Sequence, residues 1–237
     1  MTAVFRREFK SFFTRLSSYI FLALFLATVG LFMLLYNFYY GNTGFEYPLS
    51  MIGVSFALLL PIVTVGIFAK ERASGIGRFL GMLPITSREI VLGKFLSLVA
   101  ILSLMTLALA IAPFLLSAYG EVDLARSFGA LVAFFLMALA WLSIEVFLSL
   151  RIRRTPILWV VSYAFPLAMI ALGYLARLLP SALAEAVDYL SIFGAYTPFL
   201  YGLLDWRSIV VWGSVTAVFF VWTLTSSDCV FRKEAVR

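Results

Sequence analysis

Long apolar runs alternate with short polar segments along this chain. Six of the runs reach the length of about 20 residues that an α-helix needs to cross the hydrocarbon core of a bilayer. Glu145 is the one charged residue inside any of them. The pattern therefore predicts six transmembrane helices. The predicted spans are 18–40, 49–69, 95–119, 127–150, 156–175 and 208–227.

This pattern favours an all-α fold, an integral membrane bundle. A backbone in lipid must satisfy its own hydrogen bonds, and a helix does so within a single segment. A membrane β-barrel would instead show short segments of alternating polarity, which this sequence lacks. Because the six runs leave little chain for a separate soluble domain, residues 1–237 are expected to form a single transmembrane domain.

The first polar segment, about 3–16, has a helical stripe of apolar residues with basic residues on its other faces. This arrangement predicts an N-terminal amphipathic helix lying in the membrane interface. The pair Arg6-Arg7 resembles a twin-arginine export signal, but the apolar run after it, about 23 residues, exceeds the 7–15 of a signal peptide. We therefore expect an uncleaved first span. The stripe comprises Phe5, Phe9, Phe12, Phe13 and Leu16.

The polar segment 70–94, between the second and third spans, is patterned rather than irregular. Its first half has a helical apolar stripe among charged residues, Pro84 interrupts it, and Thr86 and Glu89 have the spacing of a capping box that starts a helix. Helix, break and helix are more order than a connection requires, so we expect a docking surface; the alternative is a solvated basic connector. The stripe comprises Ile76, Phe79, Leu80 and Leu83.

Segment 177–206 is the longest connection between spans. Pro180 fits the first turn of a helix, and the apolar residues after it predict a short helix at the outer membrane surface, broken at 194–198. A long loop with its own structure is often functional, but a helix that merely covers the bundle explains the pattern equally well.

Prolines occur within three of the predicted spans, at Pro61, Pro113 and Pro166. Proline frees a backbone carbonyl and kinks a helix, so these residues are candidate hinges. Prolines are also frequent in spanning helices without such a role. The sequence leaves both interpretations open.

Composition and charge fix the orientation. The chain is 63% hydrophobic and 13% charged, with a mean hydropathy of +1.04. Of its 18 basic residues, 15 fall on one side of the predicted topology: four before the first span, five in segment 70–94, three between the fourth and fifth spans and three after the sixth. The positive-inside rule places that side, with both termini, in the cytoplasm.

The net charge of +6 thus reflects membrane topology. We expect no nucleic-acid partner, while basic residues beside spans attract anionic membrane lipid. The predicted location is the inner (plasma) membrane, with multiple passes.

Candidate chemistry is sparse. With no His and one Cys, the chain lacks a ligand set for zinc, haem or an iron–sulfur cluster, and we expect neither a metal nor catalytic residues. Glu145 is an intramembrane acid and thereby a functional-site hypothesis. Because it lies about two turns before Arg151, pairing with Arg151 or with a neighbouring helix is favoured over proton relay. An intramembrane enzyme would have to rely on Glu145.

A phosphate-binding loop is also missing. Gly93-Lys94 is followed by Phe95, and Arg88 stands where the first glycine of the motif is required, so the segment cannot cradle phosphates. The chain is therefore expected not to be an enzyme. If ATP drives transport here, a second chain must hydrolyse it.

Six spans with both ends inside, an amphipathic N-terminal helix and a patterned segment 70–94 resemble the permeases of the type-2 ABC exporter family. The similarity is greatest to the branch that includes gliding-motility-associated and copper-processing permeases. The topology match covers nearly the whole chain, and the specific motif covers 70–94. The motif residues are Glu71, Arg72, Gly75, Phe79, Leu80, Pro84, Ile85, Thr86, Glu89, Ile90, Val91, Gly93 and Lys94.

This resemblance implies that segment 70–94 contains a coupling helix seated in a cytoplasmic ABC ATPase subunit. Its apolar stripe would supply the contact, and its charged residues would orient it. ATP and Mg would bind in that partner, with no cofactor in this chain, and two permease copies, identical or related, would form the pathway as a dimer. The N-terminal helix would also meet the ATPase. The implied docking residues are Glu71, Arg72, Gly75, Ile76, Arg78, Phe79, Leu80, Leu83 and Pro84.

An apolar bundle interior suits a lipid, a lipid-linked molecule or a hydrophobic peptide better than an ion. An ion channel would need a charged ring or a filter sequence, and neither is visible. The main alternative is a non-transporting membrane scaffold that recruits a cytoplasmic partner through the same segment.

Overall fold

The computed structural model describes residues 2–73, 86–176 and 191–235. Within these ranges all regular structure is helical, and six helices are long and apolar enough to cross a membrane. The predicted all-α membrane bundle is confirmed. The six candidate spans are Leu16–Tyr39, Glu46–Ile67, Ser87–Ser117, Leu124–Arg151, Thr155–Gly173 and Trp206–Ser227.

The spans are built from helices that in several cases join end to end. The elements are α1 (Thr2–Phe12), α2 (Leu16–Met33), the π-helix η1 (Leu34–Tyr39), α3 (Glu46–Leu59), α4 (Pro61–Ala73), α6 (Ser87–Leu109), α7 (Ile111–Ser117), α8 (Leu124–Arg151), α9 (Thr155–Ala176), the 3₁₀-helix η2 (Gly194–Tyr196), α11 (Thr197–Leu200) and α12 (Trp206–Ala235).

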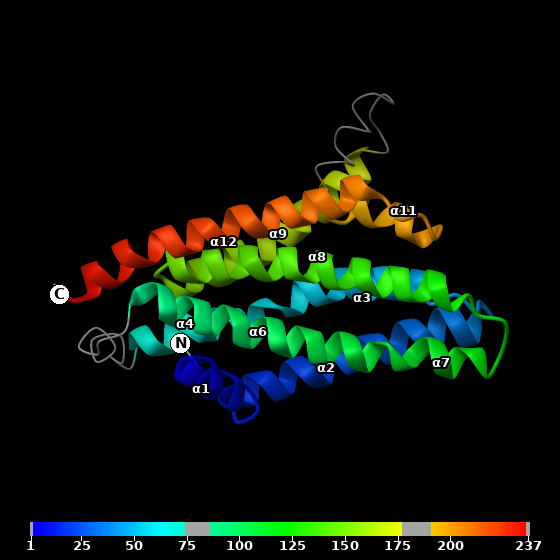
Figure 1. The fold of residues 1–237 in the computed structure, drawn as a ribbon, viewed down its shortest axis with the longest axis horizontal. Coiled ribbons are helices and arrows are strands. Elements are labelled where there is room, and N and C mark those ends of the chain that lie inside the picture. The colour runs from blue at the N-terminus through cyan, green and yellow to red at the C-terminus, as the bar shows by residue number, and fades with distance from the viewer. Residues whose placement is uncertain (1, 74–85, 177–190, 236–237) are drawn as a thin grey trace.

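Helix α8 forms the centre of the bundle and packs against α3, α4, α6, α9 and α12 (Figure 1). Its apolar residues are buried on several faces, among them Phe134, Met137 and Trp141, as expected of a helix surrounded by others. In contrast, α2, α9 and α12 bury few residues. Much of their apolar surface is therefore directed away from the bundle.

Both chain ends lie at the same end of the bundle as the last turn of α4 and the first turn of α6, whereas α7 and α11 lie at the opposite end (Figure 1). This is the relative arrangement predicted from the basic residues. It gives the molecule a basic end and an opposite end, which we call the outer end.

Two of the three prolines coincide with breaks between helices. α3 ends at Leu59 and α4 begins at Pro61; α6 ends at Leu109, four residues before Pro113, where the proline ring clashes with the carbonyl of residue i−4. α9 instead continues through Pro166. The first two positions therefore join shorter helices, and the third lies within one.

Helix α1 differs from its prediction in length and in the face that it buries. It ends at Phe12, because Arg15 adopts an extended backbone conformation (φ −90°, ψ 133°) that directs the chain into α2. Its buried residues are Val4, Glu8 and Phe12, and it packs along α6. Of the predicted stripe, Phe12 is buried but Leu16 is 75% exposed. The helix is thus docked on the bundle through a face that includes an acid.

The described part of the long connection packs into the outer end of the bundle. Tyr196 and Phe199 are buried, the Tyr196 hydroxyl donates to the carbonyl of Ala130 in α8 at 3.1 Å, and Phe199 stacks on Trp212 of α12. The predicted break at 194–198 is occupied by η2 and the start of α11. The helix predicted after Pro180 lies outside the described residues.

Candidate functional site

The predicted docking residues fall largely outside the part of the chain that the structure describes. Residues 75–84 are not described, and Glu71 and Arg72 are placed only as backbone in the last turns of α4. Their docking role stays a prediction. The structure does describe the two helices that deliver this segment, α4 before it and α6 after it.

The predicted start of α6 is confirmed. Thr86 is the N-cap; its hydroxyl accepts from the amide of Glu89 at 3.4 Å, and the Glu89 carboxylate accepts from the amide of Thr86 at 3.1 Å. Two amides at the helix start are satisfied reciprocally. The segment therefore leads directly into a capped helix that continues as the third span.

Lys94 is not on the charged surface where the sequence placed it. Because α6 begins at Ser87, Lys94 lies about two turns inside the helix, and only 1% of it is exposed. Its ammonium group donates to the carbonyl of Ile67 in α4 at 3.4 Å. Lys94 thus connects the helix before segment 74–85 with the helix after it.

A carboxylate from α1 reaches the same place. The Glu8 side chain is 6% exposed, and its oxygens lie 2.7 Å from Arg7 Nη2, 3.3 Å from Arg15 Nη2 and 3.8 Å from Lys94 Nζ. We call these four residues the junction cluster. It joins α1, the residue preceding α2, and α6, with α4 attached through Lys94.

The cations control the ionisation of Glu8. Burial raises the pKa of the Glu8 carboxyl, but the Lys94 ammonium, the hydrogen bond from Arg7 and the Arg15 charge lower it, and together they hold the pKa below its ordinary value of 4.5. Glu8 is therefore ionised at neutral pH. A buried charge is tolerated when it is paired in this way.

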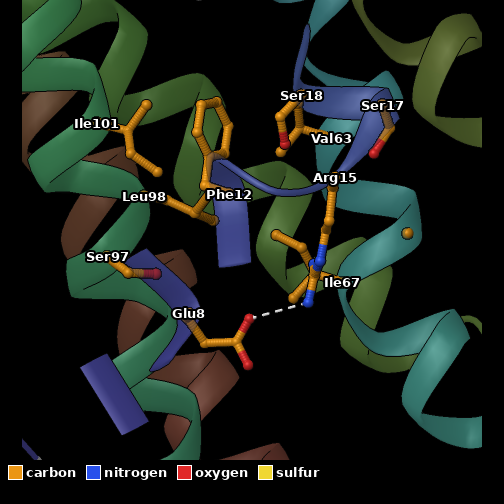
Figure 2. A pocket seen from close by; sticks show the side chains of 11 residues that line it. Glu8, Phe12, Arg15, Ser17, Ser18, Val63, Ile67, Ser97, Leu98 and Ile101 are labelled. Carbon is orange, nitrogen blue, oxygen red and sulfur yellow. Dashed lines mark hydrogen bonds and ion pairs between the residues drawn. The ribbon is translucent and has the colours of Figure 1, made fainter. Parts of the chain in front are cut away.

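Close packing accompanies the charges. A Cβ atom at Gly93 would lie 2.9 Å from Val4 Cβ and 3.2 Å from the backbone nitrogen of Phe5, so glycine lets α1 approach α6. Figure 2 shows the adjoining small cavity, in which the Glu8 carboxylate faces Arg15 between the helices that carry Ile67 and Ser97. The fit of α1 on α6 is specified by shape as well as by charge.

Sequence reasoning missed Glu8, although a signal was present. Val4, Glu8 and Phe12 follow one another at intervals of four and so share a helix face, which places an acid between two apolar residues. The aromatic residues Phe5, Phe9 and Phe13 lie on the adjacent face and dominated the pattern.

Glu145 lies in α8 and is 1% exposed. Its Oε2 atom accepts a hydrogen bond from the Thr64 hydroxyl at 3.2 Å, and the Ser149 hydroxyl donates to the Thr64 carbonyl at 2.9 Å. Of the partners considered for Glu145, the structure gives the neighbouring helix, α4, whereas Arg151 is exposed. The geometry is that of a polar link between α8 and α4.

A second ion pair lies at the outer end of the bundle. Glu46 of α3 is buried, with Oε1 3.5 Å from Arg126 Nε and 3.4 Å from the Ser127 hydroxyl of α8. Arg126 also donates to the carbonyl of Leu200 in α11. This outer cluster ties α3, α8 and α11 together, and no sequence pattern indicated it because its members are far apart in the chain.

A family model described as ABC-2 family transporter protein matches residues 29–227. The chain belongs to the ABC-2 transporter family. No curated protein matches it. The matched part runs from within α2 to within α12 and so includes the whole of segment 70–94 and the outer cluster, whereas Glu8 and α1 precede it.

Membership in the ABC-2 family makes this chain a multi-pass membrane component of a transporter. ABC-2 permeases associate in general with ABC ATPase subunits, which carry the nucleotide chemistry. Among the described residues, no group of three or more His, Cys, Asp or Glu could hold a metal ion.

An apolar groove of about 490 Å³ runs between α2 and the α6–α7 pair of this ABC-2 protein. Its lining includes Phe12, Phe13, Phe25, Met105 and Leu115. The lining suits hydrocarbon chains, as expected for a surface between two membrane spans.

Proposed function

We propose that this protein is the permease subunit of an ATP-driven ABC exporter. Two copies, identical or related, form the substrate pathway as a dimer, and segment 70–94 of each docks a separate cytoplasmic ATPase subunit that binds ATP and Mg. On this proposal the chain lies in the inner membrane with both termini in the cytoplasm.

The proposal rests on the two helices that flank segment 74–85. α4 continues as a helix to Ala73, beyond the end of its span at Ile67, and α6 starts with a capping box and runs directly into the third span. Rigid helices on both sides transmit a displacement, whereas flexible linkers would absorb it. A docked segment between such helices is therefore well placed to pass motion into the bundle.

The proposed mechanism follows from this arrangement. Closure of two ATPase subunits around ATP draws the two docked segments together, and α4 and α6 carry the movement into the spans. The two states must differ in their contacts for ATP to shift the equilibrium between them. Glu71, Arg72 and Arg78 orient the segment by charge, while Ile76, Phe79, Leu80 and Leu83 supply its apolar contact.

We further propose an apolar or amphiphilic substrate. The buried core of the bundle is dominated by aliphatic and aromatic side chains, and the acids Glu46 and Glu145 within its spans already have hydrogen-bonding partners. A lipid, lipid-linked molecule or hydrophobic peptide fits such a bundle better than an ion. Membership of the branch with gliding-motility-associated and copper-processing permeases stays a prediction.

The test is a pull-down from detergent-solubilised membranes of the native host, followed by an ATPase assay. The unaltered chain is compared with a Phe79→Asp, Leu80→Asp double variant. As a matched control, Thr155→Asp and Pro156→Asp place two carboxylates in the exposed first turn of α9, where a helix start tolerates them.

We expect an ATPase to copurify with the unaltered chain and the control but not with the double variant. Full retention by the double variant, or no ATPase with any chain, would contradict docking through this segment. The scaffold alternative predicts a copurified partner that does not hydrolyse ATP.

A further inference from the structure

We propose that Glu8 is a positioning residue for energy coupling: it fastens α1 to the helices flanking segment 74–85, so that α1, α4 and α6 move as one unit. The inference deepens the proposed function and rests on it, because a unit that moves needs a motor to move it. Glu8 itself touches neither substrate nor nucleotide on this proposal.

The geometry places Glu8 at a convergence of four elements. Lys94 projects from α6 and binds the Ile67 carbonyl of α4, Glu8 approaches Lys94 from α1, and Arg15 approaches Glu8 from the residue before α2. The cluster lies between α4 and α6, about two turns from the start of α6. A displacement of α6 relative to α1 changes the contact between Lys94 and Glu8 directly, and a displacement of α4 acts on it through the Ile67 carbonyl and Lys94.

Helix α1 depends on this attachment for its position. It has 11 residues, and isolated helices shorter than about 12–15 residues are marginal in water. Its apolar contribution to the core is small, chiefly Val4 and Phe12. The notch at Gly93 and the charges around Glu8 therefore determine where α1 lies and whether it follows α6.

A buried ion cluster suits this task better than an apolar contact. Apolar surfaces slide over one another at little cost in free energy. Separating a carboxylate from its cations inside a low-dielectric site costs much more electrostatic free energy. The cluster consequently favours one relative placement of α1 and α6. Movement of α1 together with α6 therefore costs little free energy, whereas movement of α1 away from α6 costs more.

The first experiment measures attachment without any partner. Val4, which is 7% exposed, is replaced by Cys in a Cys229→Ser background, so that the new thiol is the only one in the chain. Labelling by a maleimide is followed in the unaltered cluster, in Glu8→Gln, in Glu8→Asp and in Arg6→Gln. Arg6 is exposed on the same helix and serves as the matched control.

We expect Glu8→Gln to speed labelling about tenfold or more, as local opening becomes easier when a buried charge loses its partner. Glu8→Asp should restore part of the protection, and Arg6→Gln should change nothing. Equal rates in all four chains would overturn the inference. If Glu8→Gln fails to assemble, Arg15→Gln takes its place, since it removes one contact of Glu8 at the edge of the cluster.

The second experiment measures whether the unit moves together. Spin labels at Lys10→Cys on α1 and Leu107→Cys on α6, both exposed positions, report the distance between the two helices in the complex with the copurified ATPase. We expect the same narrow distance without nucleotide and with ATP plus vanadate. In Glu8→Gln we expect a broader distribution that changes with nucleotide, while ATPase subunits remain bound.

The outcomes separate the two proposals. If no ATPase copurifies with the unaltered chain, the proposed function fails, while the labelling rates still report on the cluster. If the ATPase binds but the distance in the unaltered chain changes with nucleotide, or Glu8→Gln leaves it narrow, positioning by Glu8 is refuted. Loss of the ATPase from Glu8→Gln would also refute it, because α1 would then be a docking surface itself.

Discussion

Glu8 and Glu145 are both buried acids, but their surroundings differ. Glu8 has three cations within 4 Å, from Arg7, Arg15 and Lys94, whereas Glu145 accepts a hydrogen bond from the neutral hydroxyl of Thr64. Paired charge stabilises a particular geometry, and a hydroxyl contact links two helices without requiring an opposite charge. Because opposite charges surround Glu8, its contribution to stability depends on its ionisation.

The sign of that dependence follows from the lowered pKa of Glu8. A group whose folded-state pKa lies below its unfolded value of 4.5 contributes fully above that pH and loses the contribution as pH falls through the folded-state pKa. The facing groups, Arg7, Arg15 and Lys94, are basic side chains, and arginine and lysine carry their charge throughout the acidic range.

We therefore expect Glu8→Gln to lower the free energy of unfolding by about 2 kcal/mol at pH 7, less than the 3–5 kcal/mol of a fully buried pair because Arg7 is half-exposed. The difference from the unaltered chain should be constant between pH 5.5 and 7.5 and should shrink below pH 4.5. Thermal unfolding in mild detergent at several pH values measures it. A difference that shrinks as the pH rises above 6 would contradict the assignment.

At the scale of elements, local signals were sufficient for the spans and for the cap of α6. Apolar length and the spacing of Thr86 and Glu89 depend on neighbouring residues only, and both predictions are confirmed. The environment of Lys94 depends instead on where α6 begins and on what packs against it. A charge near a predicted span end gives no indication of whether it faces water or another helix.

The outer cluster could not be predicted for the same reason, since Glu46 begins the second span and Arg126 lies in the fourth, so local sequence does not relate them. Removing Arg126 leaves the Glu46 carboxylate buried beside Ser127, and removal of one partner of a buried pair costs more than removal of both. The element held by this cluster is α11, through the Leu200 carbonyl.

We expect Arg126→Met to lower the free energy of unfolding by about 3 kcal/mol. The double variant that combines Glu46→Gln with Arg126→Met should lower it by less than the single change does. Arg207→Met, at an exposed arginine of the same end, is the control and should have little effect. Thermal unfolding compares the four chains. A double variant that costs as much as Arg126→Met, or more, would contradict this expectation.

At the scale of the whole molecule, docking depends on one end of the bundle. Both termini, the last turn of α4 and the first turn of α6 lie at that end. An ATP-binding partner can reach segment 70–94 only if that end faces the cytoplasm. The connection between α8 and α9, which contains Arg153 and Arg154, and the start of α1 lie at this end, whereas the connection between α7 and α8, which contains Glu121 and Asp123, lies at the outer end. What the exporter mechanism further requires is that this end of the bundle faces the cytoplasm.

Single cysteines in a Cys229→Ser background test that direction. Glu121→Cys and Arg154→Cys both replace exposed residues, at opposite ends of α8. Because 15 of the 18 basic residues fall on the Arg154 side of the topology predicted from the sequence and such residues stay in the cytoplasm, a membrane-impermeant maleimide added to intact cells should label Glu121→Cys and spare Arg154→Cys. In inverted membrane vesicles the pattern should reverse. Labelling of Arg154→Cys in intact cells would place segment 70–94 outside, where no ATPase could dock, and would refute the exporter mechanism while leaving the fold unchanged.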